Sequence, residues 1–110
     1  MSILEEVLLE EYERTLRIEK LLKEEIDTLP KGSIQEKKIK GRMYFYLQYR
    51  CNNSVKSKYV KASDVERLKQ NIQKRNDDIK QLKELQKTKS QIMKALGKEF
   101  INEHTTPGIY

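Results

Sequence analysis

The sequence predicts a mostly helical α+β protein. Two long helices pack as an antiparallel, coiled-coil-like hairpin, and a small three-stranded antiparallel β-sheet is inserted between them in the chain. Apolar residues recur every three or four positions in the first and last parts of the chain and alternate with polar residues in the middle, and turn-forming residues stand at each change of period. With 110 residues, 36% of them apolar, we expect a single domain with a thin core.

The first predicted helix covers residues 2–29. Ser2 stands three positions before Glu5, and this spacing predicts a capping box in which each side chain binds a free backbone N–H of the first turn. Pro30 cannot continue a helix and is expected to end it. Apolar side chains follow one stripe, and glutamate and lysine occupy most of the rest. The stripe consists of Leu4, Leu8, Tyr12, Ile18, Leu22, Ile26 and Leu29.

The last predicted helix covers residues 63–100 and is expected to begin with a second capping box, Ser63 and Glu66. Its apolar positions alternate by three and four, as in a coiled-coil seam. A straight helix drifts against this repeat and would bring Leu85 and Ile92 into the seam instead. The expected seam is Val65, Leu68, Ile72, Arg75, Ile79, Leu82, Gln86, Lys89, Met93, Leu96 and Phe100.

The last helix is longer than the first, so we expect part of it to project near its C-terminus. Such an overhang leaves room for a homodimer through the C-terminal helix. Residues 102–110 contain Thr, Pro and Gly and are expected to form a flexible tail.

The middle of the chain predicts a β-meander with strands at residues 33–39, 42–51 and 54–60. The predicted turns are Lys40-Gly41 and Asn52-Asn53, because Gly and Asn tolerate the positive φ of tight hairpin turns. Alternation divides the second strand into two faces. Met43, Phe45, Leu47 and Tyr49 are expected to face the core, and Tyr44, Tyr46, Gln48 and Arg50 to face solvent.

The net charge of +6 is concentrated in this middle segment. Residues 31–62 carry nine basic side chains and one acidic side chain, whereas residues 1–30 carry four basic and nine acidic ones. A field of this sign attracts phosphates or acidic protein surfaces.

The outward face of the predicted sheet is therefore a candidate nucleic-acid interface, because cations bind phosphate and tyrosine rings stack on bases. Lysines of the outer strands, including Lys37 or Lys38, could flank it if the register permits. The alternative is a solvated face whose lysines prevent edge-to-edge pairing. The candidate contact residues are Arg42, Tyr44, Tyr46, Gln48, Arg50, Lys56 and Lys58.

The same segment resembles an uncharacterised family of small bacterial and phage-associated proteins. The resemblance covers roughly residues 29–75 and includes residues 31–34 (KGSI), 42–50 (RMYFYLQYR) and 55–60 (VKSKYV). This family implies no defined activity.

The segment is also similar to the arm-binding domain of phage tyrosine integrases, in which three strands enter the DNA major groove. That resemblance implies that Gly32-Ser33 opens the sheet and that the following helix packs behind it. The chain has no recombinase domain, and its long helices depart from the integrase pattern.

Catalytic motifs are not evident in the sequence. His104 is the sole histidine and Cys51 the sole cysteine, and neither has a predictable catalytic partner. Asp77-Asp78 are expected to lie on a solvated helix face rather than to bind metal. We expect a non-enzymatic protein with no cofactor and no metal.

The compartment is expected to be the cytoplasm. Glu5 and Glu6 stand where a secretory signal would be basic, and no apolar run approaches the roughly 20 residues needed to cross a bilayer. A lone cysteine is also typical of a reducing compartment.

The sequence thus predicts an accessory protein of a bacterium, phage or mobile element that binds nucleic acid, DNA in preference to RNA. The alternative is an inhibitor or antitoxin, for example an anti-defence or anti-CRISPR-type phage protein, that binds a nucleic-acid-processing protein through the sheet or the acidic helix.

Overall fold

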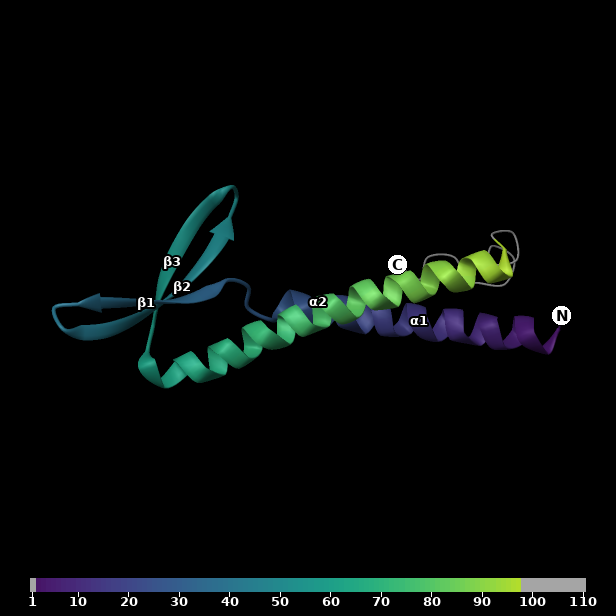
Figure 1. Ribbon diagram of the computed structural model, residues 1–110, viewed down its shortest axis with the longest axis horizontal. Coiled ribbons are helices and arrows are strands. Elements are labelled where there is room, and N and C mark those ends of the chain that lie inside the picture. The colour runs from purple at the N-terminus through teal and green to yellow at the C-terminus, as the bar shows by residue number, and fades with distance from the viewer. Residues whose placement is uncertain (1, 98–110) are drawn as a thin grey trace. The chain divides into compact units, whose positions relative to one another are not determined.

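The computed structural model describes residues 2–97, in which two helices and three strands follow one another along the chain in the order α1-β1-β2-β3-α2 (Figure 1). These residues divide into two compact units. Residues 2–27 and 78–97 form a helical hairpin, and residues 28–77 form a sheet unit. Helix α2 (Ala62–Leu96) contributes its first half to the sheet unit and its second half to the hairpin. The predicted fold class is confirmed.

Helix α1 (Ile3–Thr28) begins with the predicted capping box. The Glu5 backbone N–H donates to Ser2 Oγ at 3.1 Å, and the Ser2 backbone N–H donates to Glu5 Oε1 at 3.3 Å. This reciprocal pair satisfies N–H groups that have no partner inside the helix. The helix ends two residues before Pro30, as that proline requires.

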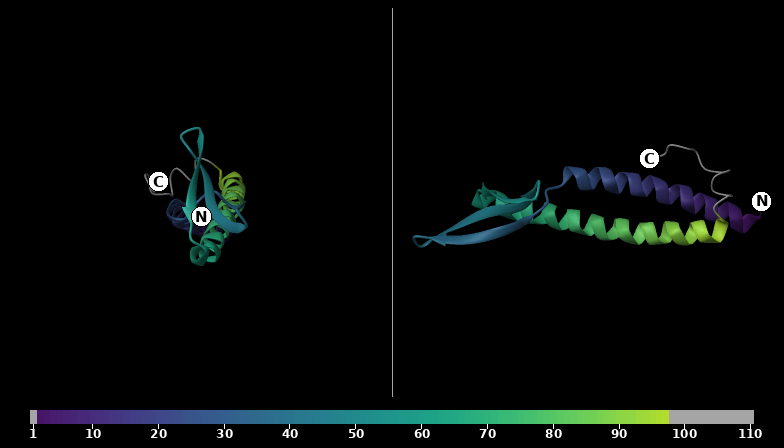
Figure 2. Two further views of the ribbon diagram at one scale, coloured as in Figure 1. Left: turned by 90° about the vertical axis from the view of Figure 1, so that its left-hand side faces the viewer. Right: turned by 90° about the horizontal axis from the view of Figure 1, so that it is seen from above.

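The helical hairpin packs α1 against the second half of α2, and the two run antiparallel (Figure 2). Its apolar core contains Tyr12, Leu16 and Ile92, and each such buried side chain contributes about 2 kcal/mol. On both helices the inward positions alternate by four and three, which is a heptad repeat. They are Leu8, Tyr12, Thr15, Glu19, Leu22 and Ile26 on α1, with the buried Leu16 beside them, and Asp78, Leu82, Leu85, Lys89, Ile92 and Leu96 on α2.

A polar contact interrupts this seam at its middle. The Lys89 ammonium group lies 3.2 and 3.0 Å from the two carboxylate oxygens of Glu19, whose side chain is only 1% exposed. Lys23, one turn further along α1, lies 3.5 Å from the same carboxylate. A buried charge needs such partners, and a charged pair at one layer also favours one register of the two helices.

The α2 seam follows the drifted repeat rather than the strict one. Ile92 is buried and Leu85 half-buried, whereas Gln86 is exposed. Asp78 is buried, so the expectation that Asp77 and Asp78 both lie on a solvated face was wrong for Asp78. Neighbouring side chains on a helix point about 100° apart, so Asp78 is buried in the hairpin while Asp77 is exposed.

Two expectations about the ends of α2 also need correction. The helix begins at Ala62, so Ser63 lies inside the first turn and is not its cap; the Asp64 N–H instead donates to the Lys61 carbonyl at 2.9 Å. Within the described residues, the part of α2 that does not pair with α1 is its first half, not its C-terminal end. This half packs instead on the centre of the sheet, where Leu47, Val60 and Leu68 come together. The expected tail, residues 102–110, lies outside the described residues.

The sheet unit contains the predicted meander. Strands β1 (Ser33–Ile39), β2 (Arg42–Cys51) and β3 (Ser54–Val60) match the expected bounds and pair antiparallel in the order β1-β2-β3. Both turns have two residues with positive φ, Lys40-Gly41 and Asn52-Asn53. This is the geometry of type I′ turns, whose twist suits two-residue hairpins.

The two hairpins of the sheet overlap over a short length only. β1 pairs with Arg42–Gln48 and β3 with Phe45–Cys51, so all three strands lie side by side only along Phe45–Gln48. Beyond this overlap each hairpin continues as a two-stranded ribbon, and the two ribbons diverge (Figure 1). The sheet therefore presents a narrow centre with two projecting arms.

The first half of α2 packs on one face of this sheet. Val60 at the end of β3 and Val65 in α2 are each 8% exposed. Leu47 and Val60 line a hollow together with Leu68 of α2, and Ile34 lines a second one with Ile72. The opposite face of the sheet carries the candidate site.

Candidate nucleic-acid interface

The register assigns every strand residue to one of two faces, because residues directly opposite in an antiparallel sheet project to the same side. The tyrosine face takes its name from Tyr44, Tyr46 and Tyr59; the helix face is the one that α2 covers. The tyrosine face consists of Ser33, Gln35, Lys37, Ile39, Arg42, Tyr44, Tyr46, Gln48, Arg50, Val55, Ser57 and Tyr59. The helix face consists of Ile34, Glu36, Lys38, Met43, Phe45, Leu47, Tyr49, Cys51, Ser54, Lys56, Lys58 and Val60.

Five of the seven predicted contact residues come together on the tyrosine face, all from β2: Arg42, Tyr44, Tyr46, Gln48 and Arg50. The arginines and Gln48 are exposed, and the two tyrosines are half-buried. The predicted separation of the two faces of β2 therefore holds, although Met43, expected on the core side, is 50% exposed. Met43 lies close to the Lys40-Gly41 turn, in the arm that projects beyond the three-stranded centre.

The other two predicted residues, Lys56 and Lys58, do not belong to this surface. Lys56 is paired with Tyr49 and Lys58 with Leu47, so both project to the helix face. The two-residue turn at Asn52-Asn53 determines this register, since it pairs Cys51 with Ser54 and thereby every later pair. Of the two flanking lysines considered in β1, Lys37 lies on the tyrosine face and Lys38 on the helix face.

Tyr59 and Gln35 complete the tyrosine face and were not predicted as site residues. Both are paired with Tyr46, one on each side. Tyr59 is 56% exposed, which leaves much of its ring open to a ligand. The length of the Asn52-Asn53 turn was the sequence signal that could have identified it, because a two-residue loop implies this pairing.

Tyr46 organises the centre of the tyrosine face. Its ring meets that of Tyr59 edge-to-face, with centroids 5.9 Å apart and planes at 72°. The Lys37 ammonium group lies over the same ring, 4.9 Å from its centroid. These contacts hold one cation and one exposed aromatic ring beside each other at the middle of the face.

The charge on the tyrosine face has a single sign. Its ionic side chains are Lys37, Arg42 and Arg50, and the one acidic residue of the segment, Glu36, projects to the helix face. Because no carboxylate shares the face, an approaching anion meets uncompensated cations there. Arg42 and Arg50 stand at opposite ends of β2, at most about 26 Å apart for an extended strand.

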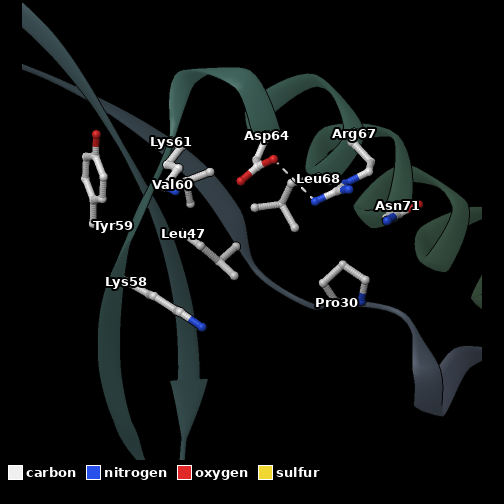
Figure 3. A pocket seen from close by; sticks show the side chains of 10 residues that line it. All are labelled: Pro30, Leu47, Lys58, Tyr59, Val60, Lys61, Asp64, Arg67, Leu68 and Asn71. Carbon is white, nitrogen blue, oxygen red and sulfur yellow. Dashed lines mark hydrogen bonds and ion pairs between the residues drawn. The ribbon is translucent and has the colours of Figure 1, made fainter.

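The helix face holds a hollow of about 500 Å³ beside the start of α2 (Figure 3). Leu47, Val60 and Leu68 converge on it from β2, β3 and α2. Lys58 and Arg67 also line it, and Arg67 is held by Asp64 at 3.3 Å. The hollow thus combines an apolar floor with a partly cationic rim.

Metal-binding clusters of three or more His, Cys, Asp or Glu side chains are absent from residues 2–97. Cys51, half-buried at the end of β2, is a free thiol. His104 lies outside the described residues.

Among the helices that the structure describes, none is long and apolar enough to cross a bilayer.

Comparison with known proteins identifies the family but not an activity. A family model described as a domain of unknown function (DUF6788) matches residues 8–70. Since this match covers more than half of the chain, the protein belongs to that family. The matched region extends from α1 through the whole sheet into the first half of α2. No curated protein and no solved structure matches the chain.

Proposed function

We propose that this member of the family is a non-enzymatic accessory protein that binds nucleic acid, duplex DNA in preference to RNA, through its tyrosine face. The resemblance to small bacterial and phage-associated proteins supports an origin in a bacterium, phage or mobile element. The observation that carries the proposal is the composition of one open sheet face, with three cations, three tyrosines and no carboxylate.

The chemistry of each residue type suits this role. Arg42 and Arg50 can each bind a phosphate oxygen with paired N–H donors. Gln48 lies between them and presents an amide, which can donate to and accept from a base edge. Tyr44 and Tyr59 offer rings and hydroxyl groups at the sides of the central Tyr46.

The shape of the sheet favours duplex DNA over a single strand. A major groove is about 12 Å wide and admits a two-stranded ribbon. Each arm of this sheet is such a ribbon, and the arm formed by β1 and β2 carries Lys37 and Arg42 on the tyrosine face. An arm in the groove would place its cations beside the phosphates of both walls.

The test compares two double variants that remove the same charge from opposite faces. Arg42→Ala/Arg50→Ala removes the two arginines from the tyrosine face, whereas Lys56→Ala/Lys58→Ala removes two lysines from the helix face. Fluorescence polarisation at low salt, with duplex DNA, single-stranded DNA and RNA, measures the dissociation constants. We expect the arginine variant to weaken duplex binding by more than about 100-fold, since a hydrogen bond to a charged group contributes about 1.5–3 kcal/mol and two are lost, and the lysine variant to weaken it less than about threefold.

Two results would argue against the proposal. Failure of the wild-type protein to bind any of the three nucleic acids would remove its basis. Equal loss in both double variants would indicate attraction by net charge and not a site on the tyrosine face. Circular dichroism of each variant excludes unfolding as the cause.

The hollow on the helix face favours a second candidate function, the inhibitor or antitoxin that binds a nucleic-acid-processing protein. Its apolar floor and cations suit an apolar side chain flanked by carboxylates. A labelled peptide with leucine between acidic residues would bind the wild type and lose affinity with Lys58→Glu. The tyrosine-face variant would leave this binding unchanged, so the two functions are distinguishable.

A further inference from the structure

Helix α1 carries a second apolar stripe that the hairpin does not use. Leu4 is 68%, Val7 51% and Leu21 64% exposed, and Ile18 between them is half-buried. These residues lie about a quarter of a turn around α1 from the seam residues Leu8 to Ile26. Isolated exposed apolar residues need no explanation, but a row of them along one helix indicates a contact surface.

The stripe follows a heptad repeat of its own. Its positions alternate by three and four along six turns of α1, which is the spacing of a helix that packs on another helix. We call these residues the α1 stripe: Leu4, Val7, Glu11, Arg14, Ile18, Leu21 and Glu25. A shallow hollow lies at its middle, lined by Val7, Glu10, Glu11, Glu13, Arg14 and Arg17.

The α1 stripe is complementary to itself when a second copy runs in the opposite direction. A two-fold axis between Tyr12 and Glu13 places the first six members of the stripe opposite members of the partner's stripe, and Glu25 lies beyond this overlap. Leu4 then meets Leu21 of the other copy, and Val7 meets Ile18. At the centre, Glu11 meets Arg14, and the symmetry repeats each contact. Apolar layers thus coincide with apolar layers, and acid coincides with base.

The residues beside the stripe also place opposite charges near each other in an antiparallel pair. Glu10 and Arg17 occupy successive flanking positions of the same heptads, and in an antiparallel pair these flanks face each other. A parallel pair would instead bring Glu11 against Glu11 and Arg14 against Arg14, which like-charge repulsion disfavours. The charges therefore select the antiparallel arrangement.

We propose that the protein forms a symmetric homodimer in which the α1 stripes of two copies pack antiparallel. The C-terminal half of α2, an alternative dimer surface, presents its apolar seam to α1 inside the hairpin, and in the described part of that half no large apolar side chain is exposed. The dimer would join two hairpins through α1, and it does not depend on what the tyrosine face binds.

The central Glu11–Arg14 contact allows a test by charge exchange. Within one chain these two side chains already form an ion pair at 3.2 Å, so Glu11→Arg and Arg14→Glu both break that internal pair. Between chains, each variant also places like charges at the dimer axis. We expect each variant alone to raise the dimer dissociation constant by about tenfold, measured by sedimentation equilibrium of the full chain.

Mixing the two variants separates the interface from the internal ion pair. In the mixed dimer, two arginines of one copy face two glutamates of the other, so we expect heterodimers to form at concentrations where each variant alone is monomeric. Native mass spectrometry resolves the species. A mixture that stays monomeric would overturn the proposal, because loss of the internal pair is the same in the mixture and in the separate samples.

A second pair of variants tests the apolar layers. Leu21→Glu places a charge opposite Leu4 of the other copy and should abolish the dimer, whereas Lys20→Glu, on the preceding residue and away from the stripe, should preserve it. Circular dichroism monitors the helices of both. A wild-type chain that is monomeric over a wide concentration range would also overturn the proposal. If that monomer bound electrically neutral vesicles and Leu21→Glu abolished this binding, a lipid surface rather than a second copy would cover the stripe.

Discussion

Tyr46 and Tyr59 face each other across β2 and β3 with their rings edge-to-face, 5.9 Å between centroids. Tyr46 is half-buried and holds the Lys37 ammonium group over its ring, while Tyr59 is mostly exposed. Tyr46 therefore supports the sheet, whereas Tyr59 is open to solvent on the candidate interface.

This division predicts different effects of two substitutions. Tyr46→Leu should lower the free energy of opening of the sheet by about 2 kcal/mol and Tyr59→Leu by about 1 kcal/mol, since both lose the ring contact, which contributes about 0.5–1.5 kcal/mol beyond burial, and only Tyr46 also loses burial. Amide hydrogen exchange of β2 residues measures both. A double-mutant cycle should give a coupling of about 1 kcal/mol; additive effects would mean that the ring contact contributes nothing.

Gly32 is predicted to be the least replaceable glycine of the described chain. Its φ is +120°, and an added Cβ would overlap the Gln48 carbonyl oxygen in β2. Gly32→Ala should therefore destabilise the sheet unit by about 3 kcal/mol, from backbone strain and displacement of β1. Urea unfolding followed by tyrosine fluorescence measures this, because Tyr44, Tyr46, Tyr49 and Tyr59 are all in the sheet.

Gly41 is the matched control for this substitution. Its φ is also positive, at +79°, but a Cβ there would meet nothing within 4 Å. Gly41→Ala should cost only the conformational term, about 1 kcal/mol. If the two variants were equally stable, the close approach of Gly32 to Gln48 would have no energetic weight.

The Glu19–Lys89 contact predicts a strong dependence of hairpin stability on one lysine. Lys89→Met removes the cation that lies 3.0 Å from a carboxylate with 1% exposure, while Lys23 stays 3.5 Å from that carboxylate. We therefore expect a loss of about 2 kcal/mol, less than the roughly 3–5 kcal/mol of a buried charge left without any partner. Lys87→Met, two residues earlier, removes a lysine that is 74% exposed and 3.8 Å from Glu84, and it should change stability by less than about 0.5 kcal/mol. Thermal unfolding followed by helical circular dichroism compares them.

A double variant that removes both charges shows whether the loss of stability comes from the unbalanced charge or from packing. Glu19→Leu/Lys89→Leu removes both charges and should recover the stability lost in Lys89→Met, because this layer of the seam then becomes apolar and holds no buried carboxylate. Continued instability of the double variant would show that the cost lies in packing and not in the unbalanced charge.

The strands could be predicted to the residue because two local signals agreed. Turn residues that tolerate positive φ stand at Lys40-Gly41 and Asn52-Asn53, and between them alternation is unbroken. The assignment of Lys56 and Lys58 to the tyrosine face was wrong. Alternation shows which residues of β3 share a face, but only the register, counted from the turn, shows which face of β2 they share. Counting from Cys51 and Ser54 places both lysines on the helix face and identifies Tyr59.

The division of α2 could not be predicted from its sequence. Val65, Leu68 and Ile72 have the same spacing as the residues that pack on α1, and periodicity alone does not say whether a stripe meets a helix or a sheet. The choice between Gln86 and Leu85 was likewise open, because it depends on whether the helix follows a repeat of 3.5 or 3.6 residues per turn. The burial of Asp78 follows from the same drift.

The salt dependence of binding gives the last prediction, which depends on the proposed function. Each neutralised phosphate contributes about −0.9 to the slope of log K against log salt concentration on duplex DNA. Arg42→Ala/Arg50→Ala should therefore make the slope shallower by about 1.8, because two phosphate contacts are lost. Lys56→Ala/Lys58→Ala carries the same loss of charge on the helix face and should keep the wild-type slope. Polarisation titrations at several salt concentrations measure all three slopes. A slope near zero for the wild type would exclude phosphate contacts, and equal changes in both variants would assign the effect to net charge rather than to the face that carries Tyr46 and Tyr59.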